Sequence, residues 1–116
     1  MNYLKLVQTL KKDLNKANID FETVKFFRKD FVSVWIWFCV LEQSYNNNNN
    51  NIENIIREIP TGYASRPTIF KIIDDAVSKK YFEKIVDEKD KRKYNLFPTS
   101  QSIKEFEEWA KVFQGF

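Results

Sequence analysis

The longest apolar stretch of this 116-residue chain runs from Phe31 to Leu41 and is broken only by Ser33. With eleven residues, it is shorter than the roughly 20 that span a bilayer, so it predicts a buried helix. Asp30 can cap this helix, which then runs to about Tyr45. A helix that is apolar on every side must be covered all round, and a second copy of the chain would supply cover that one short domain lacks. We therefore expect a homodimer.

Composition favours one mainly helical domain over residues 1–116. Only two glycines and three prolines are present, too few for the many turns of an all-β fold. The single cysteine, Cys39, cannot form a disulfide within the chain, which is typical of a reducing compartment. Met1–Leu10 contains no apolar segment of signal-peptide length. We expect a cytoplasmic protein that does not enter the membrane.

Residues 1–29 are predicted to form an N-terminal helical arm. Over Asn2–Lys16, apolar residues recur at helical spacing and lysines occupy the other faces. The apolar positions are Leu4, Val7, Leu10 and Leu14. Asn18 and Asp20 supply a break and a candidate N-cap before the next helical stretch. The apolar side of the first helix is expected to pack on residues 31–41.

A pair of short helices follows the apolar helix. Six consecutive asparagines, 46–51, read as a solvated connection whose last residue caps the next helix. Isoleucines at helical spacing predict a short helix over Ile52–Ile59, which Pro60–Gly62 ends. Ser65 is then the candidate N-cap of a helix over about 66–80, with one isoleucine-rich face.

A β-hairpin and a last helix complete the pattern. Tyr81–Val86 and Lys93–Phe97 carry the aromatic and β-branched residues typical of strands. The segment Asp87–Lys93 between them is charged and forms the tip. Either Thr99 or Ser100 can cap the final helix, whose apolar residues recur at helical spacing.

The order of these elements predicts a winged helix-turn-helix fold, mainly α with a small β-hairpin. Its parts are the arm over 1–29, a winged-helix core over 30–98 and a C-terminal helix over 99–116. In such a fold the second paired helix can enter a DNA major groove, which is wide enough for one α-helix. The hairpin can then reach an adjacent minor groove or the backbone.

Two stretches in this order resemble the MarR family of transcriptional regulators. Thr68–Asp74 reads Thr-Ile-Phe-Lys-Ile-Ile-Asp and is similar to the family's recognition-helix pattern, Ser-Thr-Val-x-Arg-Leu-Val-Asp. Asp87–Arg92 is similar to the wing signature Asp-x-x-Asp-x-Arg, and Thr99 falls where the family has Leu-Thr before the last helix. The asparagine run stands where the family has its first short strand.

The resemblance implies a homodimeric regulator that binds double-stranded DNA in a sequence-specific way. The recognition helix, about 66–80, would lie in the major groove, and the wing, 87–93, on the minor groove or backbone. The resemblance also implies a small-molecule effector of unknown identity between the arm and the DNA-binding lobe. Trp35 and Trp37 could line its pocket, although packing in the core explains them better.

DNA carries a phosphate charge about every 1.7 Å of its axis, so cations and hydroxyls are expected to contact the backbone first. The predicted DNA-binding residues are Ser65, Arg66, Thr68, Lys71, Lys89, Lys91, Arg92 and Lys93. Arg66 lies at the start of the recognition helix, where free N–H groups also suit phosphate. The net charge of +3 and the pI near 8.9 permit nucleic-acid binding without indicating it.

Three side chains near this surface have two interpretations each. Arg92 either enters a minor groove or pairs with Asp87 or Asp90 and shapes the wing. Phe70 either contacts a thymine methyl group or is buried beneath the wing. Tyr63 either touches the DNA backbone or packs within the protein.

No enzymatic activity is expected. The chain has no histidine, the commonest acid–base residue and metal ligand. It also has no glycine-rich phosphate loop and no Cys/His cluster at metal-binding spacing. We therefore predict no catalytic residue, no metal and no cofactor. The alternative function is a winged-helix protein–protein interaction module without DNA binding, which the near balance of 19 basic and 16 acidic residues favours.

Overall fold

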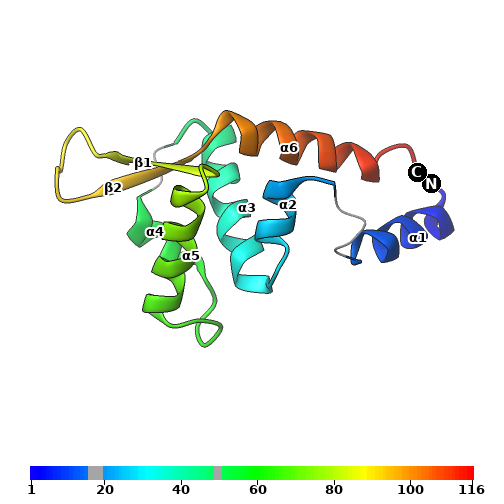
Figure 1. Ribbon diagram of the computed structural model, residues 1–116, viewed down its shortest axis with the longest axis horizontal. Coiled ribbons are helices and arrows are strands. Elements are labelled where there is room, and N and C mark those ends of the chain that lie inside the picture. Colours follow the sequence, from blue (N-terminus) through cyan, green and yellow to red (C-terminus); the bar gives the residue numbers. More distant parts are fainter. Residues whose placement is uncertain (16–19, 49–50) are drawn as a thin grey trace.

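The computed structural model describes residues 1–15, 20–48 and 51–116. The molecule is elongated, with extents of 50 × 29 × 25 Å. Figure 1 shows the hairpin at one end and the first helix at the other. The helices are α1 (Tyr3–Asp13), α2 (Glu22–Phe27), α3 (Phe31–Tyr45), α4 (Ile52–Glu58), α5 (Arg66–Ser78), α6 (Ser100–Ala110) and the 3₁₀ helix η2 (Lys111–Phe113). The strands are β1 (Phe82–Val86) and β2 (Tyr94–Pro98). The predictions that fall on Lys16, Asn18 and asparagines 49–50 lie outside the described residues.

Four of these helices start at a residue that the sequence predicts as an N-cap. Asp30, Asn51, Ser65 and Thr99 are the N-caps of α3, α4, α5 and α6. Each side chain accepts a hydrogen bond from the backbone N–H three residues later, at distances between 2.7 and 3.3 Å. Such a cap stabilises a helix by about 1 kcal/mol, because it satisfies an N–H that has no partner within the helix.

Trp37, in the middle of α3, is the centre of the core. Its ring is fully buried, lies flat against Phe27 of α2 with 4.9 Å between centroids, and meets Phe106 of α6 edge-on at 5.5 Å. The indole Nε1 donates a 2.9 Å hydrogen bond to Ser102 Oγ, which is also buried. A buried indole N–H needs an acceptor, so Ser102 allows the ring to occupy this position.

One copy of the chain covers much of α3 but not all of it, so the expectation that a second copy completes the cover stays a prediction. Segments of α2, α4, α6 and β2 pack around it. Its large side chains that stay at least 36% exposed are Phe31, Trp35, Phe38 and Tyr45. α3 has 15 residues, and within the described part of the chain every helix is too short or too polar to cross a membrane.

The hairpin joins the core at its base and leaves it towards its tip. β1 and β2 pair antiparallel from Phe82 opposite Pro98 to Val86 opposite Tyr94. Phe82 and Leu96 are buried, whereas the outer half of β1 is exposed. A bridge between Asn51 and Asn95 adds Asn51 to this sheet. Asn51 therefore lies beside β2, where the first short strand of the resembled family was expected.

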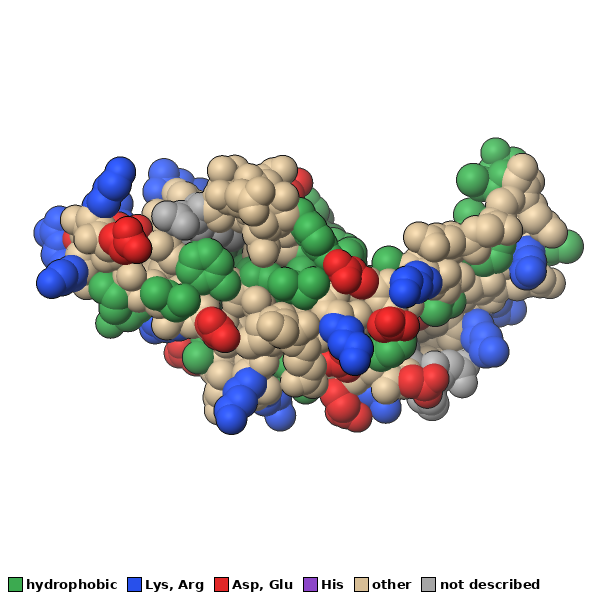
Figure 2. All heavy atoms as spheres, turned by 90° about the horizontal axis from the view of Figure 1, so that it is seen from above, with side chains coloured by type: hydrophobic (Ala, Val, Ile, Leu, Met, Phe, Trp, Pro, Cys, Tyr) green, Lys and Arg blue, Asp and Glu red, His purple; other side chains and the backbone are tan. Residues whose placement is uncertain are grey.

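α1 forms an arm whose apolar side does not pack on α3. None of its residues is buried, and the side chains on that side are 45–70% exposed. These side chains are Leu4, Val7, Leu10 and the C-cap residue Leu14. The prediction that this side packs on α3 is therefore wrong. Figure 2 shows the arm separated from the body by an open hollow.

A polar cluster holds the base of the arm instead. The Asp13 carboxylate pairs with Arg28, just after α2, and accepts a 2.8 Å hydrogen bond from Trp109 Nε1 of α6. The Arg28 guanidinium also lies 5.6 Å from the centre of the Trp109 ring. These directional contacts join the arm to the body with little apolar burial.

Lys80, the residue after the C-cap of α5, adopts a left-handed conformation with φ of 65°, which favours glycine. We expect Lys80→Gly to raise the free energy of unfolding by about 0.5–1 kcal/mol, because glycine takes this conformation without a Cβ penalty. Urea unfolding measures the change. Lys79→Gly is the control: Lys79 has φ of −84°, so its replacement should lower stability. A stability change of the same sign in both variants contradicts the explanation.

Candidate nucleic-acid interface

α5 has an apolar side within the core and a polar side on the surface. Its buried residues are Ile69, Ile72, Ile73 and Ala76. Ser65, Arg66, Thr68 and Lys71 are all exposed. The helix ends at Ser78, two residues before the predicted boundary. The four predicted DNA-binding residues of this segment therefore lie on its outer surface, at the cap and in the first two turns.

The turn between α4 and α5 determines how the two helices meet. Gly62 has φ of +90°, a conformation that side chains rarely adopt. The next residue, Tyr63, is 60% exposed, and its ring centroid lies 4.9 Å from that of Phe31. The ring thus contacts Phe31 and stays largely accessible, so the contact with the DNA backbone stays a prediction.

The polar side chains at the start of α5 already have partners. Ser65 Oγ and Thr68 Oγ1 are 2.9 Å apart and share a hydrogen bond. Arg66 Nη2 pairs with Glu53 of α4, and its guanidinium carbon lies 5.2 Å from the centre of the half-buried Phe70 ring. Phe70 thus lies beneath Arg66 and keeps part of its surface exposed.

Lys71 differs from Arg66 in how it is held. Its amine is 3.8 Å from Asp75 within the same helix, and its side chain is 76% exposed. Exposed ion pairs of this kind contribute little stability, roughly 0–1 kcal/mol, so an approaching phosphate can replace the carboxylate.

The wing is shaped by two aspartates that accept hydrogen bonds inside the loop. Asp87 accepts from the backbone N–H of Lys89 at 3.0 Å and of Asp90 at 2.9 Å, and from the side-chain amide of Asn95 at 3.0 Å. Asp90 accepts from the backbone N–H and from Nε of Arg92, both at 3.1 Å. The pairing interpretation of Arg92 is therefore observed, with Asp90 as its partner.

The same pairing leaves the basic groups of the wing accessible. The Arg92 side chain is 91% exposed. Lys89, Lys91 and Lys93 are exposed as well. Figure 2 shows Lys and Arg side chains around this end of the molecule, and Figure 1 places the hairpin and α5 on the side away from α1. The eight predicted residues thus form two groups at one end of the fold.

Two residues of this surface escaped the sequence analysis. Glu53 pairs with Arg66 across the turn, thirteen positions apart, a separation that no local spacing rule connects. Asn95 is buried within a strand and braces Asp87. A polar residue among the apolar positions of β2 was the available signal for Asn95, whereas Glu53 looked like any exposed helix carboxylate.

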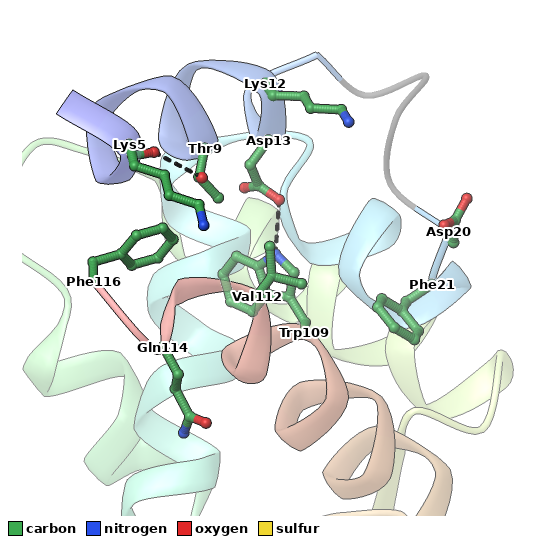
Figure 3. Close-up of a pocket in the computed structure, with 10 residues that line it drawn as sticks. All are labelled: Lys5, Thr9, Lys12, Asp13, Asp20, Phe21, Trp109, Val112, Gln114 and Phe116. Atoms are coloured by element: carbon green, nitrogen blue, oxygen red, sulfur yellow. Dashed lines mark hydrogen bonds between the residues drawn. The ribbon is translucent and has the colours of Figure 1, made fainter. Parts of the chain in front are cut away.

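A pocket of about 410 Å³ lies at the opposite end, between α1, Phe21 and the last residues of the chain. Figure 3 shows Trp109 and Asp13 joined by a hydrogen bond in its wall, with Lys5 and Phe116 at one side. Neither Trp35 nor Trp37 lines it. Trp37 is in the core, as the sequence favoured, and Trp35 packs at the surface against Phe31, with 5.6 Å between ring centroids.

The hydrogen bonds in the wing lower the pKa of both of its aspartates. For Asp87 the main cause is the Asn95 amide, followed by the backbone N–H of Asp90. For Asp90 it is the Arg92 side chain, followed by the backbone N–H of the same residue. At pH values above 3.8, the ordinary pKa of an aspartate, both carboxylates are ionised and stabilise the loop. This contribution is lost as the pH falls through the lowered, folded values.

We expect an NMR titration of the carboxyl carbons to give midpoints below 3.8 for Asp87 and Asp90. Arg92→Ala should raise the midpoint of Asp90, because it removes the side-chain hydrogen bond that lowers this pKa most. It should change the midpoint of Asp87 much less. A wild-type midpoint at or above 3.8 for Asp90 contradicts the described hydrogen bonding.

Comparison with known proteins identifies the fold. No family model matches the chain, and no curated protein matches it. A crystal structure of S. aureus MepR in complex with DNA superposes with a TM-score of 0.66 and 18% sequence identity, over 97% of this chain and 77% of MepR. MepR is a MarR-family regulator. The mainly helical architecture, the paired helices and the single antiparallel hairpin correspond to that fold, as predicted. The chain therefore has the winged helix-turn-helix fold of the MarR-type regulators.

Proposed function

We propose that this protein is a MarR-like transcriptional regulator that binds double-stranded DNA in a sequence-specific way. The observation that carries the proposal is the polar outer side of α5 at the same end of the molecule as the cationic wing. Support also comes from the fold, which is shared with a protein solved on DNA. The proposed site of action is the cytoplasm, which the single cysteine Cys39 favours.

In this proposal α5 enters the major groove and the wing over 87–93 follows the minor groove or backbone. Ser65, Thr68 and Lys71 contact the DNA from α5. Lys89, Lys91 and Lys93 neutralise phosphates from the wing. Arg92, held by Asp90 yet 91% exposed, reaches the groove with its free edge.

The proposed protein is a homodimer, and the arm is the surface that favours this. Four leucine and valine side chains along α1 are 45–70% exposed, and Val112 of η2 is 47% exposed. An apolar groove continues from Leu10 and Leu14 to Phe113 and to Phe38 of α3. Contiguous apolar surface of this kind marks an interface. A two-fold dimer would present one α5 to each half of a palindromic site.

A small-molecule effector remains part of the proposal, with its identity unknown. The pocket of about 410 Å³ lies where the arm meets the body. A ligand there would contact both parts and so bias the angle between them, which is how binding energy shifts a two-state equilibrium.

The DNA-binding surface is tested by charge removal. We expect the wild type to bind genomic duplex fragments with an affinity that falls steeply with salt. Arg66→Ala, Lys71→Ala and Arg92→Ala combined should weaken binding about tenfold or more. Fluorescence anisotropy measures both effects.

The matched control combines Lys25→Ala, Lys104→Ala and Lys111→Ala. It removes the same charge from exposed positions on α2, α6 and η2 and should leave binding nearly unchanged. A wild-type chain that binds no duplex at low salt, or equal losses in the two triple variants, would refute the proposed surface.

The dimer is tested by placing charge on the arm. We expect the wild type to sediment at twice the 14.0 kDa chain mass, and Val7→Glu with Leu10→Glu to sediment at the chain mass, because the interface would bury both carboxylates. Ile85→Glu on the hairpin, where Ile85 is 49% exposed, is the control and should stay dimeric. A wild type that sediments as a single chain refutes the dimer.

One observation favours the alternative, a winged-helix interaction module. Phe31, Trp35 and Tyr63 form an exposed aromatic contact, with Phe31 4.9 Å from Tyr63 and 5.6 Å from Trp35. Exposed aromatic residues are frequent anchors of protein interfaces. Cellular function that survives the Arg66, Lys71 and Arg92 triple substitution would select this alternative.

A further inference from the structure

Arg66 is held from two directions, unlike the other cations at the proposed interface. The Glu53 carboxylate, at the start of α4, binds one edge of its guanidinium. The Phe70 ring, one turn further along α5, lies 5.2 Å from the guanidinium carbon. The side chains of Arg66 and Glu53 remain 55% and 48% exposed, so the group is both oriented and accessible.

This geometry suits a guanidinium that is held in a fixed orientation better than one that serves to attract phosphate. An arginine fork offers five N–H donors in one plane, so a bound edge and a stacked face fix where the remaining donors point. The adjacent carboxylate offsets part of the charge and weakens the attraction of a phosphate that comes close. A cation that serves mainly to neutralise phosphate gains nothing from such a neighbour.

The location adds a second constraint. Arg66 is the first residue of α5, and in helix-turn-helix proteins the N-terminal residues of the recognition helix contact base edges. The base edge that an arginine fork matches is that of guanine, through O6 and N7. Lys71, 76% exposed and 3.8 Å from a carboxylate on its own helix, has no comparable restraint.

We infer that Glu53 and Phe70 are positioning residues that hold Arg66 to read a guanine edge in the major groove, rather than to neutralise a phosphate. The inference rests on the proposed DNA binding and deepens it. It assigns to Glu53 a role in sequence discrimination, and it predicts guanine at one position of each half-site.

The test uses the full chain and a duplex selected by the wild type from a randomised double-stranded pool. The dissociation constants for that duplex and for a scrambled duplex of equal composition give a discrimination ratio, measured over a salt series. The variants are Glu53→Ala, Arg66→Lys, Lys89→Ala and the control Glu108→Ala. Glu108 pairs with a lysine and is 47% exposed, nearly as Glu53 is, but lies on α6.

We expect Arg66→Lys to lower the discrimination ratio about tenfold despite the conserved charge, since lysine cannot form the two-pronged contact. Glu53→Ala should lower the ratio about threefold or more, while the scrambled duplex binds equally well or more tightly. Glu108→Ala should leave the ratio unchanged. Lys89→Ala should weaken binding to both duplexes alike. It should also reduce the slope of log affinity against log salt concentration by about one, the effect of one lost phosphate contact.

The outcomes separate this inference from the function on which it rests. A wild type that selects no duplex overturns the proposed DNA binding and the inference together. A wild type that selects a duplex without guanine beneath α5, or Arg66→Lys and Glu53→Ala variants with the wild-type ratio, overturns the inference alone. Thermal unfolding of each variant shows whether a lower discrimination ratio reflects lost structure. Replacing that guanine by inosine, which keeps O6 and N7, should preserve the ratio.

Discussion

The burial of Trp37 is the interaction on which the rest of this structure depends. One indole ring in the middle of α3 stacks on Phe27, meets Phe106 edge-on and donates to Ser102, and so joins α2, α3 and α6. Large aromatic rings contribute most of the apolar area that a small core can bury. Because Ser102 Oγ accepts from the indole N–H, burying the Trp37 ring leaves its own donor satisfied. α3 thereby becomes the axis around which the two ends of the molecule are arranged.

The two ends differ in how they are attached to that axis. The winged end is joined by apolar burial: four residues of α5 and the base of the hairpin are part of the core. The arm is joined by polar contacts of Asp13 with Arg28 and Trp109, and none of its helical residues is buried. A surface supported by the core suits recognition of a nucleic acid, because the major groove is wide enough for one α-helix. An arm held by few contacts suits a part that another copy of the chain completes.

Within the winged end, carboxylates orient Arg66 and Arg92. Asp90 holds Arg92 in the loop and leaves its outer edge accessible, while Glu53 and the Phe70 ring orient Arg66. Two of the chain's 16 acidic residues thus stand beside the arginines that they position. A modest net charge is therefore compatible with a DNA-binding surface that relies on oriented donors as well as on total charge.

The sequence by itself determined the elements and their order. Local signals suffice for this: helical spacing of apolar residues, the caps Asp30, Asn51, Ser65 and Thr99, and a charged tip between two β-prone segments are all contained within a few residues of one another. They were enough to predict the winged helix-turn-helix fold and the exposure of the α5 residues. Only the tertiary structure decided that α3 is largely covered by its own chain, that α1 leaves its apolar side open, and that Glu53 meets Arg66. Each of these depends on contacts between segments far apart in the chain, whose distance no periodicity encodes.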